Sequence, residues 1–283
     1  MNIKTRELFF LILVKLTIFY LTLFLGIICA VRLATIFEYQ NVELPSISLF
    51  NFLFTFFIAT VLLIALITII KKRTVKGKIL KVLFGSISLF GSLMFFNAFL
   101  PAMFSLILVL FLGLWWIKKP TVLNQDILMV FAFSGIGAQL GLSLDYRVVI
   151  LILIVLSIYD FIAVYKTKHM VKMAKEMIEV GTIPGFVFPF QTSGFLKSTA
   201  EVKPGEGKFL ILGGGDIILP LMFSVSLLEF GVLTSFLVSI FSLIGVLFNF
   251  LLLFLQKERK PIPALPLISL FSITGYFFIK LFD

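Results

Sequence analysis

Nine long apolar runs dominate this sequence and leave little room for other structure. A helix needs about 20 apolar residues to cross the hydrocarbon core of a bilayer, so each run can supply one transmembrane helix. Hydrophobic residues make up 60% of the chain and charged residues 13%, which excludes an ordinary soluble domain. The sequence therefore predicts an all-α polytopic membrane protein with nine transmembrane helices. The runs cover residues 8–31, 47–70, 82–98, 101–117, 127–144, 148–165, 209–228, 232–255 and 262–281.

The basic residues are distributed unevenly around these runs. The chain carries 24 lysines and arginines against 14 acidic residues, an excess more typical of cytoplasmic loops than of nucleic-acid binding in so apolar a chain. With a cytoplasmic N-terminus, 20 of the 24 fall in inner connections, and only Arg32, Arg147 and Lys280 lie outside. Lys15 lies within the first span, near enough to its inner end to snorkel to the interface. We therefore expect the N-terminus in the cytoplasm and the C-terminus outside.

The spacing of the runs divides the chain into three parts. Residues 1–165 form an N-terminal six-helix part, and residues 209–283 form a C-terminal three-helix part. Between them, residues 166–208 form a cytoplasmic loop whose first segment, 168–180, has the pattern of an amphipathic surface helix. In the fifth span, the small residues Gly137 and Gly141 predict a helix-packing face.

Two ionisable residues lie in the middle of predicted spans. Asp160 is in the sixth span and Asp216 is in the seventh. A charge at the bilayer centre costs on the order of 3 kcal/mol or more, so such residues are the first candidates for function. The other acids fall in loops or at span ends, including Glu7, Asp126, Asp145 and Glu229.

The depth of the two aspartates predicts that they meet. Asp160 is six residues before Lys166 and Asp216 is eight after Lys208. At about 1.5 Å per residue, these offsets place them roughly 9 and 12 Å from the same inner boundary. Gly213 lies on the helical face of Asp216 and would let the two helices approach closely.

Two carboxyl groups in contact within a low-dielectric site share one proton, because both cannot be ionised. The ionised group takes a proton from water as the water attacks a carbonyl, and the protonated group donates to the carbonyl oxygen. Such a pair can hydrolyse a peptide bond without a metal or cofactor, and we expect that chemistry here. The single histidine, His169, lies outside the spans, so neither an intramembrane Ser-His dyad nor an H-E-x-x-H zinc site is present.

A proline-rich segment precedes the ninth span. Pro261, Pro263 and Pro266 remove backbone donors and predict an irregular entry to that helix. The segment begins near the predicted level of the aspartates, so we expect it to border their site.

Three short motifs in these positions resemble those of a known family. Tyr159-Asp160, Gly213-Gly214-Gly215-Asp216 and Pro263-Ala264-Leu265 are similar to the YD, GxGD and PAL motifs of the presenilin and signal peptide peptidase family. The order of motifs and the nine-span plan also agree, and the short loops resemble those of the archaeal presenilin homologues. The resemblance implies an intramembrane aspartyl protease with Asp160 and Asp216 as catalytic residues. It implies supporting roles for Tyr159, Gly213, Gly215, Pro263, Ala264 and Leu265.

The resemblance also implies what the protein works with. Its substrates would be transmembrane helical proteins or signal-peptide remnants, which unwind near the cut and pair as a strand with the segment before the seventh span, here residues 199–208. We expect a multi-pass protein of an archaeal plasma membrane that contacts the lipid bilayer and no nucleic acid. A chain this compact is expected to act without obligatory partner subunits, and a homo-oligomer is compatible with it.

Two other functions fit parts of the pattern. A prepilin or preflagellin peptidase also uses a GxGD motif with a second aspartate, although fewer spans and no PAL segment are expected there. Two intramembrane carboxyl groups could instead carry protons or cations in a transporter or leak channel. Discontinuous helices in two related halves would support the transporter, and the sequence shows no internal repeat.

Overall fold

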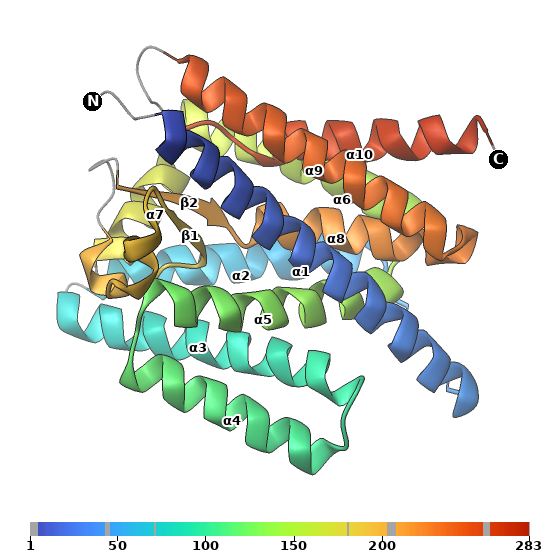
Figure 1. Ribbon diagram of the computed structural model, residues 1–283, viewed down its shortest axis with the longest axis horizontal. Helices are drawn as coiled ribbons and strands as arrows, with labels where there is room; N and C mark the ends of the chain where they lie inside the picture. The colour runs from blue at the N-terminus through green and yellow to red at the C-terminus, as the bar shows by residue number, and fades with distance from the viewer. Residues whose placement is uncertain are drawn as a thin grey trace.

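The computed structural model describes residues 5–42, 46–70, 72–179, 181–202, 208–256 and 261–282. Most of these residues are helical, and a small sheet lies at the end of the bundle where α1 begins (Figure 1). The α-helices are α1 (Thr5–Tyr39), α2 (Leu49–Ile69), α3 (Arg73–Asn97), α4 (Ala102–Lys118), α5 (Val122–Leu142), α6 (Tyr146–Phe161), α7 (His169–Glu179), α8 (Gly215–Ser226), α9 (Val232–Leu255) and α10 (Leu265–Lys280). The strands are β1 (Gly185–Pro189) and β2 (Phe209–Gly213).

Each of the nine predicted runs overlaps one of these helices. Within the described residues, six helices are long and apolar enough to cross a membrane: α1, α2, α3, α5, α6 with its π-helical extension Ile162–Lys166, and α9. The apolar helices α4 and α10 are shorter, and α8 has 12 residues. The predicted break between the third and fourth spans is confirmed, because α3 ends at Asn97 and Pro101 is the N-cap of α4.

Polar side chains fix where several helices begin. The Ser48 hydroxyl accepts a hydrogen bond from the backbone N–H of Asn51 at the start of α2, and Thr121 does the same for Asn124 at the start of α5. Asp145 accepts from the N–H of Arg147 and caps α6. These caps satisfy N–H groups that the first turn of a helix leaves unpaired.

The core forms around α5, which packs against α1, α3 and α8. The predicted packing face of α5 is confirmed. A Cβ atom at Gly137 would lie 2.5 Å from the Leu221 side chain of α8, and one at Gly141 would lie 2.5 Å from Val225. Without side chains at these two positions, α8 can approach α5 closely. Helix α8 also packs against α1, α6, α9 and α10, so helices surround it.

A two-stranded antiparallel sheet corrects the expectation of an all-α protein. Strands β1 and β2 pair in a register that runs from Gly185 opposite Gly213 to Pro189 opposite Phe209. We expected residues 209–213 to begin the seventh helix, yet α8 begins only at Gly215. A short apolar run followed by three glycines suits a buried strand as well as a helix, and periodicity alone does not distinguish them.

The segment expected to pair with substrate also differs from the prediction. Of residues 199–208, Thr199–Glu201 form a 3-10 helix, and 203–207 lie outside the described residues. The strand begins at Phe209, directly after the expected segment.

Helix α7 covers most of the segment 168–180 that was predicted to form a surface helix. Residue 180, at the predicted end of this helix, lies outside the described residues. Met177 packs with Leu80 of α3, and Lys76 forms an ion pair with Glu176 at 3.2 Å. These contacts hold α7 beside the sheet at one end of the bundle (Figure 1).

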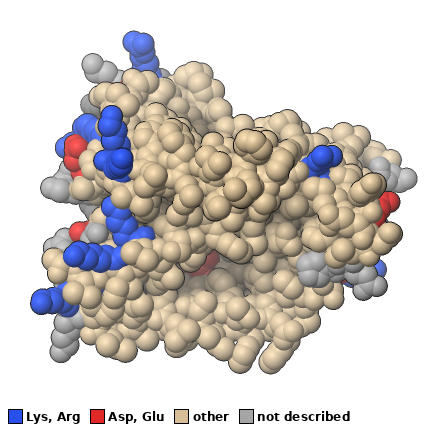
Figure 2. Space-filling view, turned by 90° about the horizontal axis from the view of Figure 1, so that it is seen from below, with Lys and Arg blue, Asp and Glu red and all other residues tan. Residues whose placement is uncertain are grey.

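Charged side chains mark the ends of the molecule. Figure 2 shows lysine and arginine gathered mainly at one end of the visible face, whereas the broad middle is almost free of charge. An acidic group is visible there at the bottom of a hollow. A wide uncharged belt between charged ends is the surface expected of a protein embedded in a bilayer.

Candidate active site

Asp160 and Asp216 lie on two helices that pack against each other. Asp160 is in the last turn of α6 and is 6% exposed, and Asp216 is in the first turn of α8 and is partly buried. The two carboxyl groups are close enough for their charges to interact. The structure thus brings together the pair that the sequence singled out.

The backbone between Lys208 and Asp216 is not the continuous helix that was assumed when the depth of Asp216 was predicted. Residues 209–213 are extended and rise about 3.3 Å each, so Asp216 lies farther from Lys208 than a helix would place it. Strand β2 ends at Gly213, whose backbone N–H donates a hydrogen bond to the Asp216 carboxylate. Strand β2 therefore positions Asp216 in the site.

The three glycines before Asp216 have different surroundings. A Cβ at Gly213 would lie 3.3 Å from Oδ2 of Asp216, so a side chain there would crowd the carboxylate. A Cβ at Gly214 would lie 2.7 Å from the Phe133 ring of α5. Nothing lies within 4 Å of the corresponding position at Gly215. The close contact at Gly214 was missed by sequence reasoning, because only the fold brings Phe133 there.

The segment Pro263-Ala264-Leu265 borders Asp160. Leu265 is the first residue of α10, and its backbone N–H donates to the Asp160 carboxyl group. Such an N–H has no partner within its own helix, so it is free for an outside acceptor. The Pro263 carbonyl accepts a hydrogen bond of 3.2 Å from Nδ2 of Asn249 in α9, which fixes the segment. Ala264 and Leu265 are both buried.

Tyr159 contacts a different part of the protein. Its ring meets Phe56 and Phe57 of α2 edge to face, with ring centroids 6.2 and 5.9 Å apart. Tyr159 therefore packs α6 against α2, next to Asp160 in the chain.

Of the described residues, no group of three His, Cys, Asp or Glu side chains is arranged to hold a metal ion.

Two charged residues are more deeply buried than the sequence analysis expected. The prediction that Lys15 snorkels to the interface is wrong, because its side chain is 3% exposed. Asp126, assigned to a span end, is 2% exposed within α5. Both lie in apolar stretches near a predicted boundary, so distance along the chain gave no sign of their burial.

Asp126 and its neighbour Gln125 hold β1 in place. Oδ1 of Asp126 accepts a hydrogen bond of 3.0 Å from the backbone N–H of Val187. Nε2 of Gln125 donates to the carbonyls of Ile183 and Gly185 at 3.0 and 3.2 Å. Since β1 pairs with β2, these side chains of α5 position the strand that leads to Asp216.

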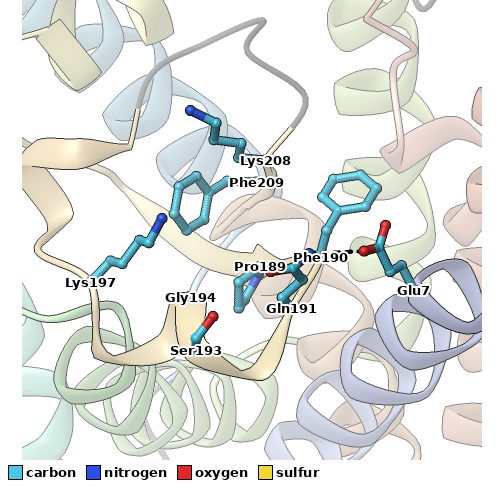
Figure 3. Close-up of a pocket in the computed structure, with 9 residues that line it drawn as sticks. All are labelled: Glu7, Pro189, Phe190, Gln191, Ser193, Gly194, Lys197, Lys208 and Phe209. Carbon is cyan, nitrogen blue, oxygen red and sulfur yellow. Dashed lines mark hydrogen bonds between the residues drawn. The ribbon is translucent and has the colours of Figure 1, made fainter. Parts of the chain in front are cut away.

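A cavity of about 220 Å³ lies at the other end of the sheet (Figure 3). Gln191 crosses it to donate a hydrogen bond of 2.9 Å to Glu7 of α1, and Lys197 and Lys208 lie nearby. None of the predicted site residues lines this cavity. It adjoins Pro189 and Phe209, where the two strands begin to pair.

Comparison with known proteins identifies the family of this chain. The family model described as signal-peptide peptidase, presenilin aspartyl protease matches residues 16–283. The chain belongs to this family. The predicted activity of an intramembrane aspartyl protease, a membrane-embedded hydrolase with several spans, is thereby confirmed. The family assignment also favours proteolysis over the transporter and prepilin-peptidase alternatives.

Two solved structures share the fold. One is a presenilin family intramembrane aspartate protease in space group C222, with a TM-score of 0.61, 25% identity, and coverage of 95% of this chain and 99% of that chain. The other is a presenilin family intramembrane aspartate protease in space group P2, with a TM-score of 0.60, 23% identity, and coverage of 94% and 97%. Comparison with curated proteins gave no match.

Proposed function

We propose that Asp160 and Asp216 are the catalytic pair, and that they hydrolyse peptide bonds within transmembrane helices. One observation carries the proposal: the carboxyl groups of Asp160 in α6 and Asp216 in α8 interact with each other. Each carboxyl group also accepts a hydrogen bond from the backbone N–H of a residue in one of the three motifs. Leu265 donates to Asp160 and Gly213 to Asp216. These donors hold the carboxyl groups in place without adding a charge.

The chemistry needs one proton shared by the pair. The ionised aspartate removes a proton from water as the water oxygen bonds to the carbonyl carbon, and the protonated aspartate gives its proton to the carbonyl oxygen. The resulting diol collapses when the first aspartate protonates the amide nitrogen and the second takes back a hydroxyl proton. The carbon–nitrogen bond breaks, and the pair returns to its starting state.

The hydrogen-bond pattern of the sheet indicates where an unwound substrate would bind. Phe190 N–H donates to the Lys208 carbonyl, and Gly214 N–H donates to the Pro184 carbonyl. In an antiparallel pair, bonded and non-bonded residue pairs alternate. Val187 and Ile211 are therefore a non-bonded pair, in keeping with the N–H of Val187 donating to Asp126 instead. The backbone N–H and carbonyl of Ile211 consequently point away from β1.

The two outer edges of the sheet differ. The outer edge of β1 is closed, because Asp126 and Gln125 occupy its polar groups and Pro189 has no N–H. All five residues of β1 are buried, whereas four of the five in β2 are partly exposed. A substrate strand would therefore add to β2 at Ile211, and this edge leads directly to Asp216.

The membrane placement follows the charge pattern. We place the N-terminus in the cytoplasm, the C-terminus outside, and all nine apolar helices across an archaeal plasma membrane. The three-part division at residues 165 and 208 keeps Asp160 in the six-helix part and Asp216 in the three-helix part. The protein would act on membrane-embedded helical substrates without obligatory partner subunits.

Replacing each aspartate by asparagine tests the catalytic proposal. The purified protein, reconstituted in liposomes with a helical membrane substrate, should cleave it. Asp160→Asn and Asp216→Asn should each lower the rate on the order of 1,000-fold, because neither amide can exchange a proton with water or the carbonyl. Asp145→Asn is the matched control, since an exposed asparagine still caps α6. Full cleavage by either active-site variant would overturn the proposal.

A further inference from the structure

Asn249 is a buried amide within the apolar helix α9. Its side chain is 6% exposed and lies six residues before the end of that helix. The other polar side chains of α9 are hydroxyl groups, which can bond to carbonyls of their own helix. A buried amide is costly unless a partner satisfies it, so Asn249 requires a specific contact.

That contact is the carbonyl of Pro263, at the start of the segment that leads into α10. Nδ2 of Asn249 donates a hydrogen bond of 3.2 Å to this oxygen. The helix that follows cannot satisfy it. The first backbone bond of α10 joins the Ile268 N–H to the Ala264 carbonyl, and Pro266 has no N–H with which to close a turn. Among the described residues, Asn249 is therefore the donor on which the Pro263 carbonyl depends.

A second contact on the same face of α9 fixes the first turn of α10. Gly245 precedes Asn249 by about one helical turn. A Cβ atom at Gly245 would lie 2.8 Å from Cα of Ile268 and 3.1 Å from the carbonyl oxygen of Leu267. The backbone of α10 thus rests directly on α9 beside the Asn249 hydrogen bond. Together the two contacts hold residues 263–268 against α9.

The segment held in this way borders both helices of the aspartate pair. Helix α10 packs against α6 and against α8. Leu265, its first residue, belongs to the same buried cluster as Leu156 of α6 and Leu219 of α8. Leu156 lies four residues before Asp160, and Leu219 lies three residues after Asp216, so each leucine shares a helical face with one aspartate. A shift of residues 263–265 would therefore disturb the packing that sets the two carboxyl groups against each other.

We propose that Asn249 is a positioning residue that, by holding the Pro263 carbonyl, fixes segment 263–265 against the helices carrying Asp160 and Asp216. This inference rests on the proposed function, in which the two aspartates activate water. Asn249 acts through the backbone of this segment and not on the substrate. Loss of its hydrogen bond should therefore slow the chemical step more than it weakens substrate binding, because hydrolysis needs both carboxyl groups aligned with the water and the scissile carbonyl.

The test is the kinetics of Asn249→Leu in the whole protein, reconstituted in liposomes with a helical membrane substrate. Leucine is similar in size but cannot donate to the Pro263 carbonyl. We expect kcat to fall on the order of 10-fold or more while KM stays within about twofold of wild type. Asn249→Asp keeps the shape, and its carboxyl group donates only while it is protonated. Its rate relative to wild type should therefore be highest at acidic pH and fall as the pH rises.

Ser242→Ala is the matched control, because it also removes a hydrogen bond between α9 and α10. The Ser242 and Ser272 hydroxyl groups are 2.7 Å apart, and Ser242 lies seven residues from Asn249, about 10 Å along the helix. This control should keep kcat within about twofold of wild type. An unchanged kcat in Asn249→Leu would overturn the inference. An equal loss in Ser242→Ala would do the same, since it would reveal a general effect of helix packing.

Two further comparisons keep the result interpretable. If Asn249→Leu fails to fold, Asn249→Asp decides, and a rate relative to wild type that does not change with pH would contradict the role of Asn249. Asp160→Asn and Asp216→Asn are assayed in parallel. If both are inactive and Asn249→Leu cleaves normally, only this inference fails, whereas normal cleavage by either aspartate variant overturns the proposed function and the inference with it.

Discussion

At the scale of single residues, buried charges organise this protein. Asp160, Lys15 and Asp126 are buried and Asp216 is partly buried, and each interacts with a specific neighbour. A buried polar group without a partner is costly, so each charge constrains the structure around it. Asp126 shows this clearly, because its only described hydrogen bond ties α5 to the strand before the site.

Replacing Asp126 should loosen the sheet. Asp126→Leu leaves the buried N–H of Val187 without an acceptor, which should lower the free energy of unfolding by ~1–3 kcal/mol. Asp126→Asn keeps an acceptor oxygen and should stay close to wild type. Thermal unfolding in detergent micelles measures the difference, and cleavage by Asp126→Leu should fall as well. Equal melting temperatures for the two variants would show that the hydrogen bond does not anchor β1.

Residue chemistry alone predicted part of this arrangement. Asp160 and Asp216 could be found because an acid in the middle of an apolar run is costly wherever the helix packs. Lys15 could not be interpreted correctly, because a lysine near a span end either reaches water or turns inward, and only the position of Phe250 decides between them. The crowding at Gly214 likewise depends on Phe133, 81 positions earlier in the chain.

At the scale of elements, the sheet joins the membrane helices to the catalytic chemistry. Strand β2 runs into α8, and β1 anchors it to α5 through Gln125 and Asp126. The sequence predicted helices well, because long apolar runs have few alternatives in a bilayer. The sequence analysis wrongly assigned residues 209–213 to the seventh helix. A short apolar run of this kind forms a strand when a neighbouring segment can pair with its backbone N–H and carbonyl groups. That neighbour, Gly185–Pro189, lies in the loop 166–208, for which the sequence analysis predicted only the helix at 168–180.

Proline substitutions in β2 distinguish its two edges. Ile211→Pro removes an N–H that points away from β1, so the hairpin should persist while a substrate carbonyl loses one backbone donor. We expect kcat/KM to fall about 10-fold, the equivalent of one hydrogen bond of ~1.4 kcal/mol, with little change in thermal stability. Leu210→Pro, at a position of similar exposure, removes an N–H bonded to Phe188 and should lower both stability and activity. The edge assignment is wrong if Ile211→Pro cleaves normally.

At the scale of the whole molecule, the site exists only because distant parts of the chain close on each other. Helix α6 carries Asp160, α8 carries Asp216, and α10 supplies the N–H of Leu265. The motifs fixed the order of these parts along the sequence, whereas the contacts among α1, α8 and α9 arise only from packing. The charged ends and the uncharged belt between them are the surface expected of a protein embedded in a bilayer (Figure 2).

The structure of this protein bound to a peptide mimic with a single hydroxyl at the scissile position is the most direct measurement. That hydroxyl stands where water would attack, so its oxygen should lie within about 3 Å of a carboxyl oxygen from both Asp160 and Asp216. The extended mimic should also pair with β2 at Ile211. A hydroxyl that contacts only one aspartate, or a mimic bound away from both, would contradict the shared-proton mechanism.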